Sequence, residues 1–416
     1  MVNRVRIEII IYSTVLLLLT GCGKTYTGDE NSRNTGLEPL DENIPVMLAI
    51  GDPVYSMLTR GSGAFDSELS NAIEMWKKAV FYIYAFKIED DVDFRLLSRD
   101  NNEHCLVDGS MDTNGTKMGK RARLNGDRAS YLSWIDSSEI FYDSENQTRP
   151  YRFFGFYIDD LSVKESDIER TSDAIKIKVQ IDGTQDIMST VATLTDEQKD
   201  AIRKSDNKEL IMNSLYSAYA ARQGVHPVLA FHHRLARVKF KIFPASEASD
   251  NIYVESVSVD SKTDGVFTVV AKDAKSIGLD FTNSTIVKPL LLCELGGESL
   301  KQDYYRVPWI PEEANKDIYE RTGVEVGESL LLAPDMDVYK MKLRLKQIFP
   351  DQSSKWYDLF YDLKVNGRFQ AGMQYTVRVA VYGLEDADVN VVVDGWREGE
   401  SIEISPDDWT KQEYIK

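Results

Sequence analysis

Residues that could carry out catalysis or bind metal are few and scattered in this chain of 416 residues. The chain has four histidines, His104, His226, His232 and His233. Neighbouring side chains of a strand point to opposite faces, so His232 and His233 cannot easily share a metal ion. We expect one of these two imidazoles to be buried and the other exposed.

Cys105 and Cys293 could form one disulfide, but their spacing does not require it. The sequence contains no HExxH, GxSxG, P-loop or GxGxxG motif and no Cys/His cluster at zinc spacing. It therefore predicts no enzyme activity, no metal site and no cofactor.

Acidic residues dominate the charge of the chain. Its 67 Asp and Glu residues outweigh 49 Lys and Arg residues, which gives a net charge of −18. Pairs such as Asp159-Asp160 and Asp407-Asp408 lie in turn-like contexts, as solvated surface carboxylates do. Asp186, which follows Gly183, is expected to serve a turn. The negative charge argues against a nucleic-acid partner, because binding phosphates requires Lys and Arg.

The N-terminus carries a candidate site of covalent modification. Two arginines precede an apolar stretch over residues 7–19, which is too short for a membrane-spanning helix. The stretch closes on Leu19-Thr20-Gly21-Cys22, and small residues before a cysteine are typical of a bacterial lipobox. We expect residues 1–21 to be a lipoprotein signal peptide and the Cys22 thiol to carry the lipid anchor. The polar residues 22–43 then read as a flexible tether.

Alternation of apolar and polar residues, the pattern of a strand with one dry face, dominates the rest of the chain. It is clearest at residues 175–181, 339–345 and 375–381, and residues 79–86 are apolar on both faces, as in a central strand. The alternation changes parity within residues 229–242, which predicts a bulge or a crossover between sheets near Ala236. These patterns predict a mainly all-β fold of antiparallel β-sandwiches.

A short helical insertion interrupts the strands. Thr195 and Gln198 form a plausible capping box for a helix that runs to Lys204. A second helix is expected over residues 208–221. The best domain boundary lies at residues 244–250, where Pro, Ser, Glu and Asp break two strand patterns. We therefore expect an N-terminal β-sandwich at residues 61–245 and a C-terminal one at residues 246–416.

A strand and a loop precede the first predicted sandwich, at residues 44–60. Large apolar side chains alternate along this strand, at Ile44, Val46, Leu48 and Ile50. Burying them would contribute roughly 6–12 kcal/mol as an upper estimate. Arg60 follows among small residues that are typical of an accessible loop.

Several segments together resemble the fimbrillin family, whose members build type V pili. They are the lipobox at Cys22, Leu58-Thr59-Arg60-Gly61-Ser62-Gly63, Gln185-Asp186-Ile187-Met188, Phe231-His232-His233-Arg234-Leu235-Ala236-Arg237-Val238, and Phe369-Gln370-Ala371-Gly372-Met373-Gln374-Tyr375 running to Tyr382-Gly383-Leu384, with Trp396 near the end. Each segment alone is only a loose match to the family. Together, and in this order, the segments span most of the chain. The resemblance implies two tandem transthyretin-like sandwich domains.

The resemblance also implies a route of assembly. Such pilins are exported as outer-membrane lipoproteins held to the bilayer by acyl groups. A protease then cuts after an arginine, here between Arg60 and Gly61, and removes the first strand. A strand from another pilin subunit fills the groove, and the polymer can bind a host or bacterial surface ligand. Ile402 and Ile404 alternate in the C-terminal tail, which is either this donor strand or an ordinary last strand of the second sandwich.

The same sequence is also compatible with a different function. A glycan-binding surface lipoprotein would carry exposed aromatic residues on its sandwich, with Trp309, Trp356 and Trp396 as candidates. Pull-down on polysaccharides would separate this class from a fimbrial subunit. A secreted hydrolase is disfavoured, because no acid–base pair or nucleophile constellation is recognisable.

Overall fold

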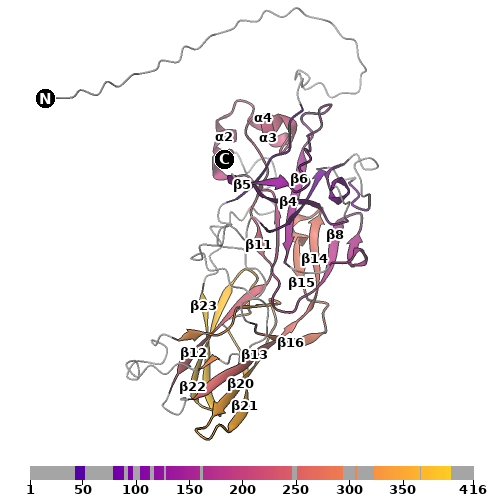
Figure 1. Cartoon of the computed structure of the whole chain (residues 1–416). Helices are drawn as coiled ribbons and strands as arrows, with labels where there is room; N and C mark the ends of the chain where they lie inside the picture. The colour runs from indigo at the N-terminus through magenta and orange to yellow at the C-terminus, as the bar shows by residue number, and fades with distance from the viewer. Residues whose placement is uncertain are drawn as a thin grey trace, which may run out of the picture. The chain divides into compact units, whose positions relative to one another are not determined.

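The computed structural model describes residues 43–51, 78–88, 92–96, 104–112, 117–125, 128–159, 163–245, 251–293, 305–306, 323–365 and 367–394. By its contacts the chain divides into Met1–Pro39 and Leu40–Lys416, and all of the described residues belong to the second unit. The fold of this unit is all-β, as the alternating pattern predicts (Figure 1).

The largest sheet, the first sheet, collects strands from the N-terminal half of the described chain. Its strand order is β10-β1-β5-β4-β2-β6-β9-β11, and β3 also pairs with β2. These strands are β1 (Leu48–Ile50), β2 (Phe81–Lys87), β3 (Cys105–Val107), β4 (Lys120–Asn125), β5 (Arg128–Trp134), β6 (Tyr151–Ile158), β9 (Ile187–Val191), β10 (Val228–Leu229) and β11 (His232–His233). The strand predicted at residues 79–86 is β2, which lies between β4 and β6 and buries side chains on both of its faces.

A second sheet packs on one face of the first. Its order is β15-β14-β8-β7, formed by β7 (Ile168–Arg170), β8 (Ala174–Gln180), β14 (Asp264–Ala271) and β15 (Gly278–Asp280). Their shared core includes Phe154 and Phe156 from β6, Ile177 from β8 and Phe267 from β14. The rings of Phe156 and Phe267 meet edge to face with centroids 5.8 Å apart. Such aromatic contacts stabilise the core beyond the apolar area they bury.

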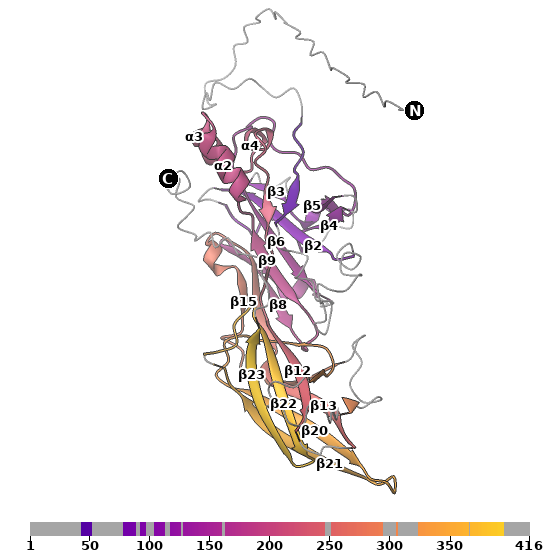
Figure 2. The same cartoon turned by 90° about the vertical axis from the view of Figure 1, so that its left-hand side faces the viewer.

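Two further sheets enclose a separate core. One has the order β18-β12-β22-β23, with β19 also on β12, and the other has β16-β13-β20-β21, with β17 on β13. Figure 2 shows β12, β22 and β23 side by side. The strands are β12 (Ala236–Pro244), β13 (Ile252–Lys262), β16 (Val287–Leu291), β17 (Tyr305–Arg306), β18 (Val324–Glu325), β19 (Leu330–Leu332), β20 (Tyr339–Ile348), β21 (Ser354–Leu363), β22 (Gln374–Gly383) and β23 (Asp386–Asp394).

The predicted crossover near Ala236 is confirmed. His232 and His233 pair with β9 in the first sheet, whereas Ala236 begins β12 in a sheet of the other core. Leu235 accordingly belongs to the first core and Ala236 to the second. Strand β19 also joins the two cores, because Leu330 and Leu332 lie in one and Leu331 lies in the other.

One set of pairings does not follow the predicted domain boundary. β14 and β15 come after residue 245, yet β14 pairs with β8 from Asp264↔Gln180 to Ala271↔Ala174. Residues 264–280 therefore complete the sheet that covers the N-terminal core. The division into domains at residues 61–245 and 246–416 stays a prediction.

The helical insertion is also placed. α2 (Asp196–Lys204) begins with the predicted capping box, in which the Thr195 hydroxyl accepts from the Gln198 N–H. The single helix predicted over residues 208–221 is wrong, because the chain forms α3 (Lys208–Asn213) and α4 (Ala218–Arg222) instead. Between them Tyr216 has a φ of +54°, which cannot continue a right-handed helix. Short 3-10 turns occur at Gly109–Met111, Glu165–Asp167 and Ala274–Ser276. No helix within the described ranges is long and apolar enough to span a membrane.

Candidate functional site

Residues 44–50, which we call the first strand segment, lie inside the first sheet. Their regular part is β1, which pairs antiparallel with β5 through Leu48↔Leu132 and Ala49↔Tyr131. On its other side β1 pairs parallel with β10 through Ala49↔Val228 and Ile50↔Leu229. β1 thus occupies a slot between two strands that come much later in the sequence.

The side chains of the first strand segment divide into a buried and an outer row. Val46, Leu48 and Ile50 keep only 7%, 2% and 8% of their surface exposed, and Ile44 is half-buried. Met47 is 38% exposed on the opposite side of the strand. The predicted alternation therefore corresponds to a real apolar face, although Ile44 contributes less than the other three residues.

The first strand segment changes partners at Met47. Before this residue, the Val46 N–H donates to the carbonyl of Ile140 over 2.7 Å, and the Ile44 carbonyl accepts from the Tyr142 N–H over 3.0 Å. After it, the Ala49 N–H donates to the Pro227 carbonyl over 3.0 Å. The segment is therefore held by three separate stretches of chain rather than by one continuous ladder.

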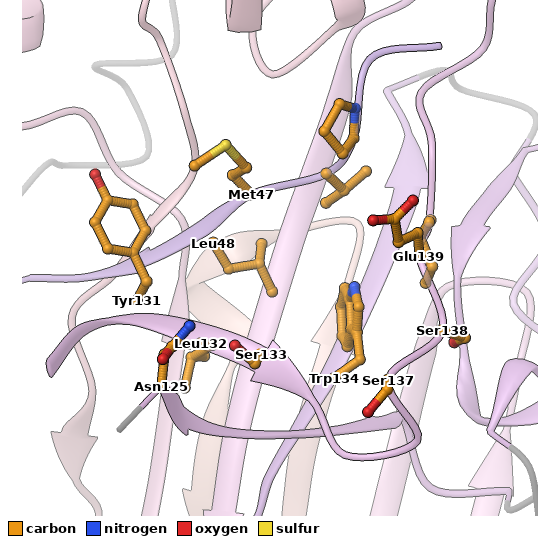
Figure 3. A pocket seen from close by; sticks show the side chains of 13 residues that line it. Met47, Leu48, Asn125, Tyr131, Leu132, Ser133, Trp134, Ser137, Ser138 and Glu139 are labelled. Carbon is orange, nitrogen blue, oxygen red and sulfur yellow. The ribbon is translucent and has the colours of Figure 1, made fainter. Parts of the chain in front are cut away.

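A hollow opens where the segment leaves β5. Its volume is about 420 Å³, and it is lined by residues 45–48, by Asn125, by residues 131–134 and by residues 137–140. In Figure 3, Leu48 points from the strand towards β5, whereas Met47 points to the other side of the strand. The hollow lies directly beside the strand whose removal the resemblance to fimbrillins implies.

A buried ion pair stiffens the wall of the hollow. The Lys120 ammonium lies 2.7 Å from the Asp136 carboxylate, and their side chains are 0% and 6% exposed. Lys120 also donates to the Met111 carbonyl over 2.7 Å and lies 5.7 Å from the centre of the Trp134 ring. Burial alone would raise the pKa of Asp136, but hydrogen bonds from Lys120 and Ser138 lower it well below its usual range.

Many of the predicted site residues lie outside the described part of the chain. These are the lipidation residue Cys22, the cleavage residues Arg60 and Gly61, the tail residues Ile402 and Ile404, and the aromatic candidates Trp309 and Trp396. Their proposed roles stay predictions. The structure does describe Trp356, which is 44% exposed on β21, and Phe360, four residues further along the same face, which is 70% exposed.

The sequence analysis missed a buried pair of residues. The Asp186 carboxylate lies 2.8 Å from Nδ1 of His233, and both side chains are 0% exposed. Asp186 therefore does more than serve a turn, since it binds the end of β11 to the start of β9. His232 is half-buried rather than fully exposed. Because the partners are far apart in sequence, only their presence in two motif segments could have indicated this contact.

Two expectations concern metal and sulfur chemistry. Within the described residues, no group of three or more His, Cys, Asp or Glu side chains could hold a metal ion. No disulfide joins Cys105 to Cys293. Burial raises the pKa of the Cys293 thiol, and the nearby acids Asp182 and Glu328 raise it further. This cysteine is therefore a poor nucleophile.

Comparison with known proteins gave distant structural likenesses only. No protein-family model matches the chain, and no curated protein matches it significantly. A fimbrial protein from Bacteroides vulgatus is 13% identical with a TM-score of 0.46, and the match covers 85% of this chain and 100% of that one. A "putative cell adhesion protein" from Bacteroides uniformis is 11% identical with a TM-score of 0.44, over 86% of this chain and 100% of that one. At TM-scores below 0.5 these likenesses carry no conclusion about function.

Proposed function

We propose that this chain is a structural or adhesive subunit of a cell-surface fimbria. It is exported as a lipoprotein precursor with lipid on Cys22, cut after Arg60, and assembled with other pilin subunits by strand exchange. Its location is then the outer membrane before cleavage and the fimbria afterwards. The sequence resemblance to fimbrillins motivates the proposal, and the placement of β1 is the observation that carries it.

The placement of β1 supports exchange for a physical reason. β1 sits between β5 and β10, so its removal would leave two unpaired strand edges facing one another across an apolar trench. An extended segment from another chain can pair with both edges and cover the trench, as in other cases of β-strand addition. Cleavage at Arg60 would free this strand without cutting any other described strand, because the structure describes β1 before this residue and all other strands after it.

Substitution of Arg60 tests the proposal. Arg60→Ala should keep the first strand segment covalently attached and leave the protein as a lipid-anchored monomer. The matched control is Arg33→Ala, which removes an arginine that precedes β1 and should leave assembly unchanged. The measurement is the amount of high-mass polymer released from the cell surface, together with N-terminal sequencing of the shed form, which should begin at Gly61. Equal polymer from Arg60→Ala and wild type would contradict the proposed maturation.

The lipid anchor is tested separately. Cys22→Ala should abolish incorporation of labelled fatty acid and leave precursor in the inner membrane or periplasm, because the lipobox cysteine supplies the acylated thiol. Continued labelling of this variant would refute the lipoprotein assignment without affecting the strand-exchange proposal.

A glycan-binding surface lipoprotein is the second candidate function. The observation that favours it is the pair of exposed rings on β21, Trp356 and Phe360. The Trp356 indole N–H donates to the Glu255 carboxylate over 2.9 Å, and the Lys346 ammonium lies 5.1 Å from the ring centre. A ring held in this way could stack on a sugar. Retention of the wild-type chain on a polysaccharide resin, lost in Trp356→Ala, would favour this function.

A further inference from the structure

The first strand segment does not fill its slot. Its registered pairs with β5 are Leu48↔Leu132 and Ala49↔Tyr131, although β5 continues to Trp134. Continuing the same register would place Val46 opposite Trp134. The Val46 N–H instead donates to the Ile140 carbonyl, so this part of the segment turns away from β5. The end of β5 consequently faces the hollow rather than a neighbouring strand.

The hollow has the size and lining of a site for a side chain. Leu132 and Trp134 of β5 supply apolar walls, Leu48 of the first strand segment supplies another that leaves with the segment, and Ser137, Ser138 and Glu139 lie along one side (Figure 3). Its volume is about 420 Å³. Apolar cavities of ~150 Å³ already take up benzene, so an aromatic side chain fits this space.

The wall at Trp134 does not depend on the first strand segment. Trp134 pairs with Ala122 of β4 on the other side of β5, and Lys120 of the same strand lies against its ring. The buried ion pair between Lys120 and Asp136 holds the Lys120 side chain in place against this ring. We therefore expect the wall to persist after the first strand segment leaves.

We propose that the strand replacing residues 44–50 carries an aromatic side chain that fills this hollow. The aromatic residue lies two positions from the residue that takes the place of Leu48, because side chains two apart on a strand share a face. The occupant is thus an extended segment of another chain that pairs along β5 as far as Trp134. This inference rests on the proposed strand exchange and adds the feature by which the slot recognises its partner.

The replacement strand should bind more tightly than the first strand segment because its ring is buried in the hollow. A strand that follows β5 to its end exchanges the hydrogen bonds to Ile140 and Tyr142 for pairing with Trp134, and its aromatic ring covers apolar surface of β5 that now borders the hollow. A copy of the first strand segment with valine at position 46 does not gain this buried surface. The two cases therefore predict different affinities for the same slot.

Two synthetic peptides test this difference on the full chain after limited cleavage by an arginine-specific protease. One peptide copies residues 44–50, and the other carries phenylalanine in place of the valine at position 46. Binding is followed by fluorescence anisotropy of labelled peptides. We expect the phenylalanine peptide to bind at least tenfold more tightly than the copy. Trp134→Ala should reduce this ratio below threefold, whereas the control Tyr357→Ala, at an exposed position on β21, should leave it unchanged.

The outcomes separate the two proposals. Equal binding of both peptides to the wild-type chain would overturn the role of the hollow and leave strand exchange standing. Binding of neither peptide would overturn strand exchange itself and this inference with it. If circular dichroism shows that Trp134→Ala does not fold, the ratio measured on the wild-type chain decides the question alone.

Discussion

Leu48 offers the sharpest test of how firmly the first strand segment is docked. Its side chain is 2% exposed and packs beside Leu132, its cross-strand partner in β5. Truncation of a buried leucine to alanine costs 2–5 kcal/mol in protein cores, and we expect Leu48→Ala to cost about 3 kcal/mol here. Met47→Ala is the matched control on the same strand, because Met47 is 38% exposed and its loss should cost at most about 0.5 kcal/mol.

Amide hydrogen exchange can locate this loss of stability. The N–H groups of Val46, Ala49 and Gly51 donate to carbonyls outside the first strand segment, so they report whether the segment is docked. If the segment opens without the rest of the sheet, a loss of 3 kcal/mol should accelerate their exchange by roughly 100-fold. Exchange within β20, in the other core, should not change.

Two results would refute this reasoning. Equal destabilisation by Leu48→Ala and Met47→Ala would mean that the buried and outer rows of the segment are not distinct. Acceleration that spreads equally to β20 would mean that the segment cannot open alone. The second result would also weaken the proposed exchange, since exchange requires the segment to leave while the remaining sheets stay folded.

Three further predictions concern charge and the tail. Asp136→Asn should cost about 3 kcal/mol in urea unfolding at neutral pH, because it leaves the Lys120 ammonium buried without its counter-ion. Since the pKa of Asp136 is lowered in the folded protein, the wild-type contribution should be complete above the ordinary value of 3.8 and lost as the pH falls below it. Burial raises the pKa of Glu328 from 4.5 to about 7, so the folded chain should lose stability as the pH rises across that window. Glu328→Gln should therefore be about 1 kcal/mol more stable than wild type at pH 8, after allowance for solvent screening, and nearly neutral at pH 5. Replacing Ile402 and Ile404 by aspartate should abolish polymer with little change in melting temperature if the tail is a donor strand, whereas a loss of several kcal/mol in the monomer would identify an internal strand.

The elements that could be predicted from sequence are those fixed by local patterns. The alternation at residues 175–181, 339–345 and 375–381 corresponds to β8, β20 and β22, because a strand with one dry face needs apolar residues at every second position. The capping box at Thr195 could also be predicted, because its hydrogen bonds join residues only three positions apart in the sequence. The parity change near Ala236 also indicated the crossover correctly.

The choice of strand partners was not readable from these patterns. β14 is a mostly apolar strand that would suit either core, and only its pairing with β8 assigns it to the first one. The first strand segment was predicted as one uniform strand, yet it changes neighbours at Met47 because Ile140 accepts the Val46 N–H. Both features depend on contacts between residues far apart in sequence, which periodicity does not encode.

The candidate site was therefore predicted in part. The apolar row at Val46, Leu48 and Ile50 followed from the sequence, but its place inside the first sheet, between β5 and β10, did not. The hollow did not, because it arises from a mismatch between the lengths of β5 and of its pairing with β1. The buried pair of Asp186 with His233 was hidden for a similar reason, as neither residue type demands the other.

The parallel pairing of β12 with β22 has a consequence for the order in which the chain folds during synthesis and export. β12 follows directly on the first sheet, but its registered neighbours from Gln374 to Val381 lie far along the chain. Contacts between such distant residues form only after a costly loop has closed. The side of β12 that awaits β22 is therefore exposed until the last described strands have emerged, whereas β14 can already cover β8. A chaperone could bind this unpaired edge of β12 in the interval before β22 arrives.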